Sequence, residues 1–150
     1  MANTLTLTEK PTETVNREAT HGSGVWSVMY QTEAHLDSAL ENRIPHHRSI
    51  ELGWELNLDN YEEVATLDWS AYDDGVSPFG LAQNGFNTES WSRSARSGDI
   101  EGLTLSKPLE VDDNGREWGH RSMMTGDLVF NQETGQAFIC AAQGWMRFNA

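Results

Sequence analysis

The feature that most constrains the fold of this chain is a strict alternation of residue character over positions 50–58. Apolar side chains occupy every second position, and polar residues or glycine stand between them: Ile50, Leu52, Trp54, Leu56 and Leu58 against Glu51, Gly53, Glu55 and Asn57. A period of two is typical of a β-strand with one buried face and one solvated face. The sequence therefore predicts a strand here, within a sheet that has one side toward water.

Further strands are indicated by runs of aromatic and β-branched residues. Residues 25–30 predict one such strand. Near the C-terminus, residues 128–130 and 136–141 predict two more, joined by a hairpin loop over residues 131–135 in which Gly135 can adopt a positive φ. Residues 144–148 close the chain either as a last strand or as a packed tail.

Two short helices are predicted between these strands. Thr32 can cap the first helix, Leu36 and Leu40 lie on its apolar face, and Pro45 ends it. Asp59 or Asn60 would cap the second, with an apolar face formed by residues 61, 64, 65 and 67.

The order of these elements predicts an α+β fold, in which a small mixed or antiparallel sheet is covered by two short helices and ends in a C-terminal β-hairpin. Residues 1–24 have no apolar period and predict a flexible N-terminal arm, which leaves residues 25–150 as a single α+β domain. Between residues 73 and 119, frequent Gly, Asn, Ser and Asp predict loops and short strands, with Trp91 and Trp118 as the expected anchors.

The charge balance restricts the partners that such a domain can have. The 150-residue chain has ten Lys and Arg residues against 23 Asp and Glu residues, for a formal net charge of −13. Nonspecific binding to nucleic acid or to an anionic membrane depends on Lys and Arg, so neither is expected. A basic protein surface is the favoured partner, since complementary fields speed encounter. The negative charge of this chain also has a simpler explanation, because it keeps a protein soluble.

The acidic residues concentrate in one stretch, because no Lys or Arg occurs between Arg48 and Arg93. If the outward positions of the predicted strand and helix adjoin, these carboxylates form a continuous negative surface that imitates DNA; a merely solvated face is the alternative. The candidate binding residues are Glu51, Glu55, Asp59, Glu62, Glu63, Asp68, Asp73 and Asp74.

Signals for catalysis and for bound cofactors are weak. Adjacent histidines such as His46 and His47 point apart on a loop, and neither a metal motif nor a phosphate loop nor a dinucleotide fingerprint is present, so no metal and no cofactor are expected. Arg121 before Gly126-Asp127 could form an anion site, or a turn in which Asp127 bonds its own backbone and Arg121 pairs with an acid. Cys140 predicts a core residue and not a nucleophile.

Several segments resemble the YodL-like domains of small phage and plasmid proteins. The resemblance covers about half of the chain in pieces: residues 26–40, residues 52–67 with Leu58-Asp59-Asn60-Tyr61-Glu62-Glu63-Val64, residues 121–129, residues 138–140 and Gly144-Trp145. It implies an origin in a mobile genetic element, whose proteins often counter host defence or accompany DNA transfer.

Taken together, these observations predict a non-enzymatic acidic protein of a phage or other mobile element that inhibits a host defence or DNA-binding protein, of the anti-CRISPR or antirestriction type, through DNA-like charge. An adaptor of DNA transfer or packaging is the alternative, and a small enzyme is the least favoured one. The expected partner is a host protein with a basic surface, and a homodimer is compatible with the sequence. The lone cysteine, the lack of a long apolar run and the absence of signal-peptide blocks predict the cytoplasm.

Overall fold

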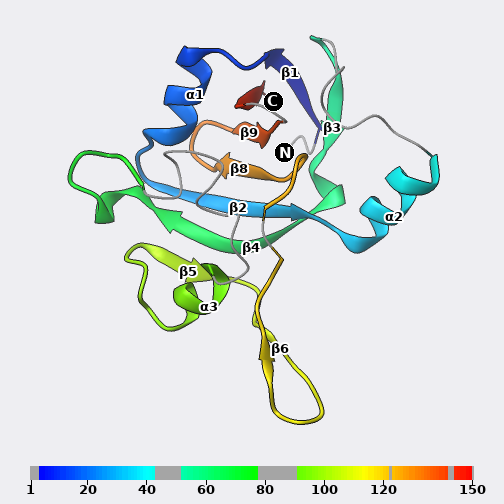
Figure 1. Ribbon diagram of the computed structural model, residues 1–150. Coiled ribbons are helices and arrows are strands. Elements are labelled where there is room, and N and C mark those ends of the chain that lie inside the picture. The colour runs from blue at the N-terminus through cyan, green and yellow to red at the C-terminus, as the bar shows by residue number, and fades with distance from the viewer. Residues whose placement is uncertain (1–3, 43–51, 78–90, 122, 142–143, 150) are drawn as a thin grey trace.

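The computed structural model describes residues 4–42, 52–77, 91–121, 123–141 and 144–149 (Figure 1). Most of its strands form one eight-stranded sheet that curls into a half-barrel. In spatial order these strands are β3 (Glu55–Asn57), β1 (Thr4–Glu9), β10 (Trp145–Asn149), β9 (Gln136–Cys140), β8 (Leu128–Asn131), β2 (Val25–Gln31), β4 (Tyr61–Asp68) and β5 (Leu103–Leu105). Every neighbouring pair in this sheet is antiparallel.

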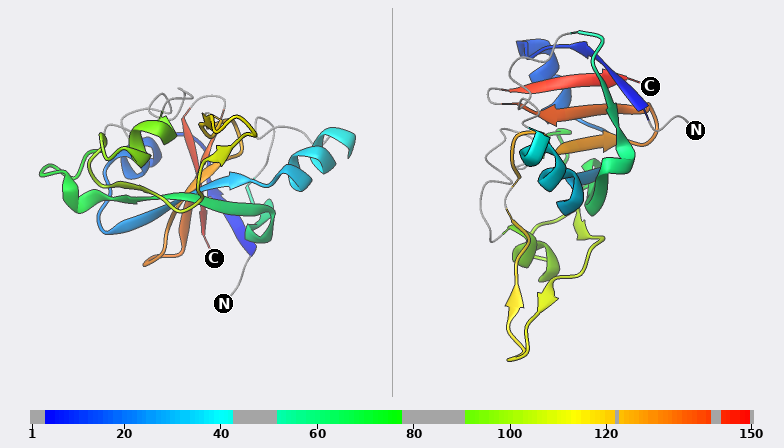
Figure 2. Two further views of the ribbon diagram at one scale, coloured as in Figure 1. Left: turned by 90° about the horizontal axis from the view of Figure 1, so that it is seen from below. Right: turned by 90° about the vertical axis from the view of Figure 1, so that its right-hand side faces the viewer.

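The remaining elements lie around this sheet. The described helices are α1 (Glu13–Thr20), α2 (Glu33–Asn42) and α3 (Trp91–Arg96), with 3₁₀ turns η1 (Leu58–Asn60) and η2 (Trp69–Ala71). Strands β6 (Glu110–Val111) and β7 (Glu117–Trp118) form a separate two-stranded sheet within the described part of the chain. Figure 1 and the right view of Figure 2 show this hairpin projecting from the body of the molecule.

Alternating side chains of the sheet divide the apolar interior into two clusters. One lies on the face that α1 and α3 cover, where Trp26 stacks on Phe138 with ring centroids 5.5 Å apart and Trp69 meets Trp26 edge-on at 5.1 Å. The other is built almost entirely by the strands themselves, from residues such as Leu7, Ile139 and Phe148. The strands curl around this second cluster, and none of the α-helical side chains that the structure describes belongs to it.

The prediction that two short helices cover the sheet is therefore wrong. α2 begins where the sequence predicted, and the backbone N–H of His35 donates to the Thr32 hydroxyl at 3.2 Å as the expected cap. None of its residues whose side chains are described, up to Asp37, is buried, and Figure 1 shows α2 beyond the end of β2 and not across the sheet.

The second predicted helix is the strand β4, which pairs with β2 along its whole length. The register shifts between Val28 and Met29 of β2, so β4 has one extra residue there and Val64 and Ala65 both face the helix-covered cluster. Such a bulge breaks the period of two. The resulting spacing of Tyr61, Val64 and Ala65 matches the i, i+3, i+4 pattern of a helix, which explains the error.

The strand predicted over residues 50–58 is also shorter than expected. Only Glu55–Asn57 form β3, because the chain turns at Gly53 with φ +90°. Leu56 is buried, whereas Leu52 is 62% exposed and Trp54 is 37% exposed. Residues 50 and 51 lie outside the described residues. The prediction that Trp54 is a core residue is wrong.

Residues 4–24 do not form the flexible arm that the sequence suggested. β1 lies inside the sheet between β3 and β10, and its Leu5 and Leu7 side chains are 1% exposed. α1 buries Val15 and Ala19 against the same fold, and its Asn16 side chain accepts the Trp145 N–H at 2.9 Å. The N-terminal segment is thus a structural part of the sheet.

Other predictions are confirmed. β2 and the β8–β9 hairpin occupy the expected residues, with φ +74° at Gly135, and the last segment is the strand β10. Trp91 is a buried anchor as expected, but Trp118 is 50% exposed on the projecting hairpin. No helix in the described part of the chain is long and apolar enough to span a membrane.

Candidate binding cleft and acidic surface

A buried ion pair organises the junction between β2 and the segment before β8. The Asp127 carboxylate is fully buried and accepts hydrogen bonds from both terminal nitrogens of Arg121, Nη1 at 2.6 Å and Nη2 at 3.0 Å. It also accepts the backbone N–H groups of Gln31 and Met124, each at 2.9 Å. The turn interpretation of this motif is therefore confirmed, since Asp127 bonds nearby backbone and pairs with Arg121.

The aromatic ring of Tyr30 packs against the Arg121 guanidinium of this ion pair. The Arg121 guanidinium carbon lies 4.3 Å from the centre of the ring, a distance at which the cation is attracted to the ring face. The Tyr30 hydroxyl donates to the Arg121 carbonyl at 3.1 Å, and Trp91 Nε1 donates to the same oxygen at 3.3 Å. Burial, and then the negative charge of Asp127, raise the pKa of Tyr30, so its hydroxyl stays a donor.

A cleft of about 220 Å³ opens beside Arg121, where β2 and β4 face the base of the β6–β7 hairpin. Lys107 Nζ pairs with Glu62 at 2.8 Å across it, and the His120 ring bonds the Lys107 carbonyl at 2.8 Å through Nε2. Its lining residues are Tyr30, Gln31, Glu62, Val64, Lys107, Glu110, Trp118, Gly119, His120 and Arg121. This cleft brings together cations, carboxylates and an exposed indole.

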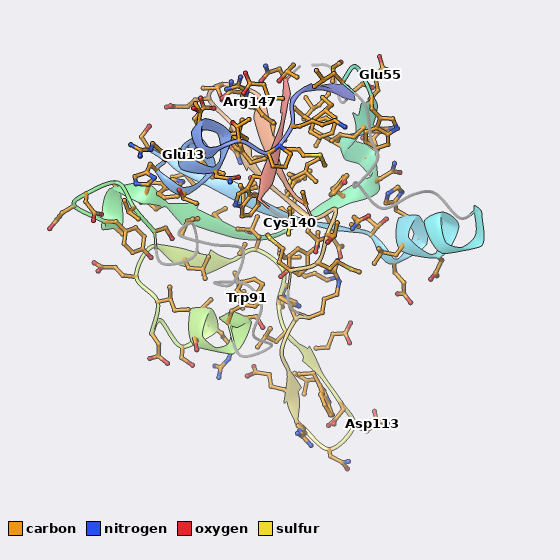
Figure 3. The ribbon with its side chains drawn as sticks, turned by 45° about the horizontal axis from the view of Figure 1, so that its top comes forward. Glu13, Glu55, Trp91, Asp113, Cys140 and Arg147 are labelled. Carbon is orange, nitrogen blue, oxygen red and sulfur yellow. The ribbon has the colours of Figure 1, made fainter. Side chains whose placement is uncertain are left out.

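The predicted binding residues are spread over different parts of the molecule. Glu55 lies on β3 and Asp59 in η1, both exposed, and Figure 3 shows Glu55 at the opposite end of the molecule from Asp113 at the hairpin tip. Glu51 lies outside the described residues. The structure therefore does not support the continuous negative surface that was expected to run from the predicted strand at residues 50–58 into the predicted helix after it.

Glu62 and Glu63 are neighbours on a strand, so their side chains leave the sheet on opposite faces. Glu62 is engaged by Lys107 in the cleft. Glu63 accepts a hydrogen bond from the Ser27 hydroxyl at 2.6 Å, and Ser27 accepts one from Gln132 at 2.6 Å. Since both carboxylates have local partners, they do not form one joint acidic patch.

Asp68, Asp73 and Asp74 belong to one segment, in which β4 passes into η2 and the turn after it. Hydrogen bonds tie this turn to two other segments. Asp68 N–H donates to the Gly102 carbonyl at 2.7 Å and the Tyr72 hydroxyl donates to the Glu101 carbonyl, while Trp69 N–H donates to the Gly24 carbonyl at 2.9 Å. Glu133 approaches from the β8–β9 loop beside Gly24. We call this group the acidic end; its members are Asp68, Asp73, Asp74, Glu101 and Glu133.

Two members of the acidic end, Glu101 and Glu133, were not identified from the sequence. They lie about 30 and 60 residues away along the chain, so only strand pairing could place them there. Some of these acids also shape local structure: hydrogen bonds from Ser70, at 2.6 Å and 3.0 Å, lower the pKa of Asp68, and Asp74 accepts the Val76 N–H at 3.0 Å.

The other candidate chemical groups have structural surroundings. Cys140 lies buried in β9, and burial raises its thiol pKa to about 12, which is the opposite of an activated nucleophile. Burial lowers the pKa of His35, on α2. Within the described ranges, no three His, Cys, Asp or Glu side chains are grouped so that they could hold a metal ion; residues 46 and 47 lie outside those ranges.

Comparisons of the chain with models of protein families, with curated proteins and with solved structures give no match.

Proposed function

We propose that this protein is a non-enzymatic binding protein that occupies the basic, nucleic-acid-binding surface of another protein. The observation that supports this proposal is the acidic end, where three adjoining segments carry five carboxylates and none of the five forms one of the ion pairs seen in the structure. With a net charge of −13 behind them, they produce a field that attracts cationic surfaces.

The biological role that we propose is inhibition of a host defence or DNA-binding protein by a product of a phage or other mobile element. The resemblance to YodL-like domains motivates this setting. Carboxylates at the acidic end would take the place of phosphates on the partner, so the partner would lose nucleic acid when it binds this protein. Competition with DNA is the property that separates inhibition from a passive adaptor role.

Two charge-reversal variants of equal charge test this proposal. One carries Asp73→Lys, Glu101→Lys and Glu133→Lys in the acidic end; the other carries Glu55→Lys, Asp59→Lys and Asp113→Lys, all exposed and outside it. Asp68 and Asp74 are left intact because their side chains accept backbone hydrogen bonds in this segment. A partner captured from host lysate and identified by mass spectrometry is titrated with each variant, and its association rate and DNA binding are followed.

We expect the acidic-end variant to associate about tenfold more slowly at low salt, with a smaller loss at high salt because screening weakens the steering field. The control variant should lose much less, although its net charge is the same. Equal losses for both variants would show that only total charge matters. A partner that keeps its DNA while bound would rule out inhibition by competition.

A further inference from the structure

The cleft beside Arg121 is too small for an independent ligand of drug size. Its volume of about 220 Å³ lies below the range of about 300–1,000 Å³ that such ligands occupy. One long side chain of a binding partner fits this scale. The cleft has lining residues from the sheet and from the β6–β7 hairpin, which projects from the body of the molecule (Figure 1).

The charges lining the cleft define which kind of side chain it favours. Asp127, Arg121, Glu62 and Lys107 form a chain of alternating sign: Arg121 pairs with Asp127 and Lys107 with Glu62, and Glu62 is close enough to Arg121 to favour its charged form. These four charges cancel. Asp127 is fully buried behind the lining and neutralises Arg121, and Lys107 neutralises Glu62. Glu110 is the lining carboxylate for which no hydrogen bond or ion pair is found among the described residues.

The wall opposite the sheet carries Trp118, directly across the β6–β7 pair from Glu110. Residues opposite each other in a strand pair project to the same side, so the indole and the free carboxylate face the cleft together. The indole already stacks with one guanidinium, since Arg116 lies 4.3 Å from the ring centre. Indole Nε1 is held by Asp112 at 3.0 Å, which fixes the orientation of the ring.

We propose that this cleft is a binding site for an arginine side chain of the partner, whose guanidinium stacks against Trp118 and pairs with Glu110. Arginine suits the site better than lysine because its planar cation is weakly hydrated and combines stacking with paired hydrogen bonds. The inference rests on the proposed function for its partner, a protein with a basic surface, and adds a specific contact outside the acidic end.

Blocked tripeptides with Arg, Lys or citrulline as the central residue provide a defined probe. Each is titrated into the full-length protein labelled with ¹⁵N, and the indole N–H signal that disappears in the Trp118→Ala variant is followed. We expect a saturable shift with the Arg peptide, a weaker affinity by about fivefold or more for the Lys peptide, and no specific shift with citrulline, which keeps the shape and lacks the charge.

The variant Glu110→Gln should weaken binding of the Arg peptide by about fivefold or more, whereas Glu13→Gln, exposed on α1, should leave it unchanged. The remaining indole signals report whether each variant keeps its fold. Equal shifts with Arg and citrulline, or no effect of Glu110→Gln, would overturn the site. Because the peptides do not need the acidic end, this result is independent of the charge-reversal test: either can fail while the other succeeds.

Discussion

Arg121 and Asp127 meet through two hydrogen bonds although one partner is fully buried and the other keeps 35% of its side chain exposed. The pair joins the segment before β8 to β2, because the same carboxylate accepts the backbone N–H of Gln31. Gln31 Nε2 is a fifth donor to this carboxylate, at 3.5 Å, and a buried carboxylate stays satisfied only while its donors remain in place. This pair therefore connects Arg121, which lines the cleft, to strand β2 of the sheet.

Removing the carboxylate should destabilise the whole fold. Asp127→Ala leaves the Arg121 guanidinium and the N–H groups of Gln31 and Met124 without their acceptor, so we expect a loss of about 3–5 kcal/mol in the free energy of unfolding. Urea unfolding measures this change. The matched control Asp113→Ala, at the exposed hairpin tip, should change stability by less than about 0.5 kcal/mol. Similar midpoints for both variants would show that the pair is not structurally important.

The N-terminal segment should be indispensable for folding. Deleting residues 1–24 removes β1 from between β3 and β10, exposing both strand edges and the apolar cluster beneath, so we expect cooperative thermal unfolding to disappear. As a milder test, Leu7→Ala should cost about 2–5 kcal/mol, while Thr4→Ala on the exposed side should cost under about 0.5 kcal/mol. A truncated protein that still melts cooperatively would contradict this account.

Stability should fall at alkaline pH. Burial raises the thiol pKa of Cys140 from its ordinary value of 9.0 to about 12. Burial also raises the phenol pKa values of Tyr30 and Tyr61 above their ordinary value of 10.0. As pH rises, the unfolded chain loses these protons before the folded protein does. The three groups therefore contribute fully to the free energy of unfolding below about pH 9, and this contribution declines as pH rises toward their pKa values in the folded protein. Urea midpoints at a series of pH values measure the decline.

The variant Tyr61→Phe should make this alkaline decline shallower, since it removes one of the ionising groups. It also removes the hydrogen bond from the Tyr61 hydroxyl to the Gly126 carbonyl at 2.8 Å, so its stability at neutral pH should be lower than that of the wild type. An unchanged pH slope in this variant would indicate that Tyr61 does not contribute to the decline.

Local signals in the sequence predicted the elements that depend on neighbouring residues. Thr32 caps α2 through a contact only three residues away, and Gly135 permits the hairpin turn between β8 and β9. The composition also determined the strong negative charge. Each of these features depends on short-range geometry or on residue type alone, so it can be read without the fold.

The tertiary structure decided what depends on pairing between distant segments. β1 has only a short alternation of Thr and Leu over residues 4–8, and its place inside the sheet is decided by pairing with β3 and β10 on both sides. β4 has a helix-like spacing that a bulge against β2 produces. The acidic end and the cleft arise in the same way, since they join residues from separate strands and loops. Strand pairing and burial override weak local preferences because long-range hydrogen bonds and apolar contacts contribute more free energy than intrinsic propensity does.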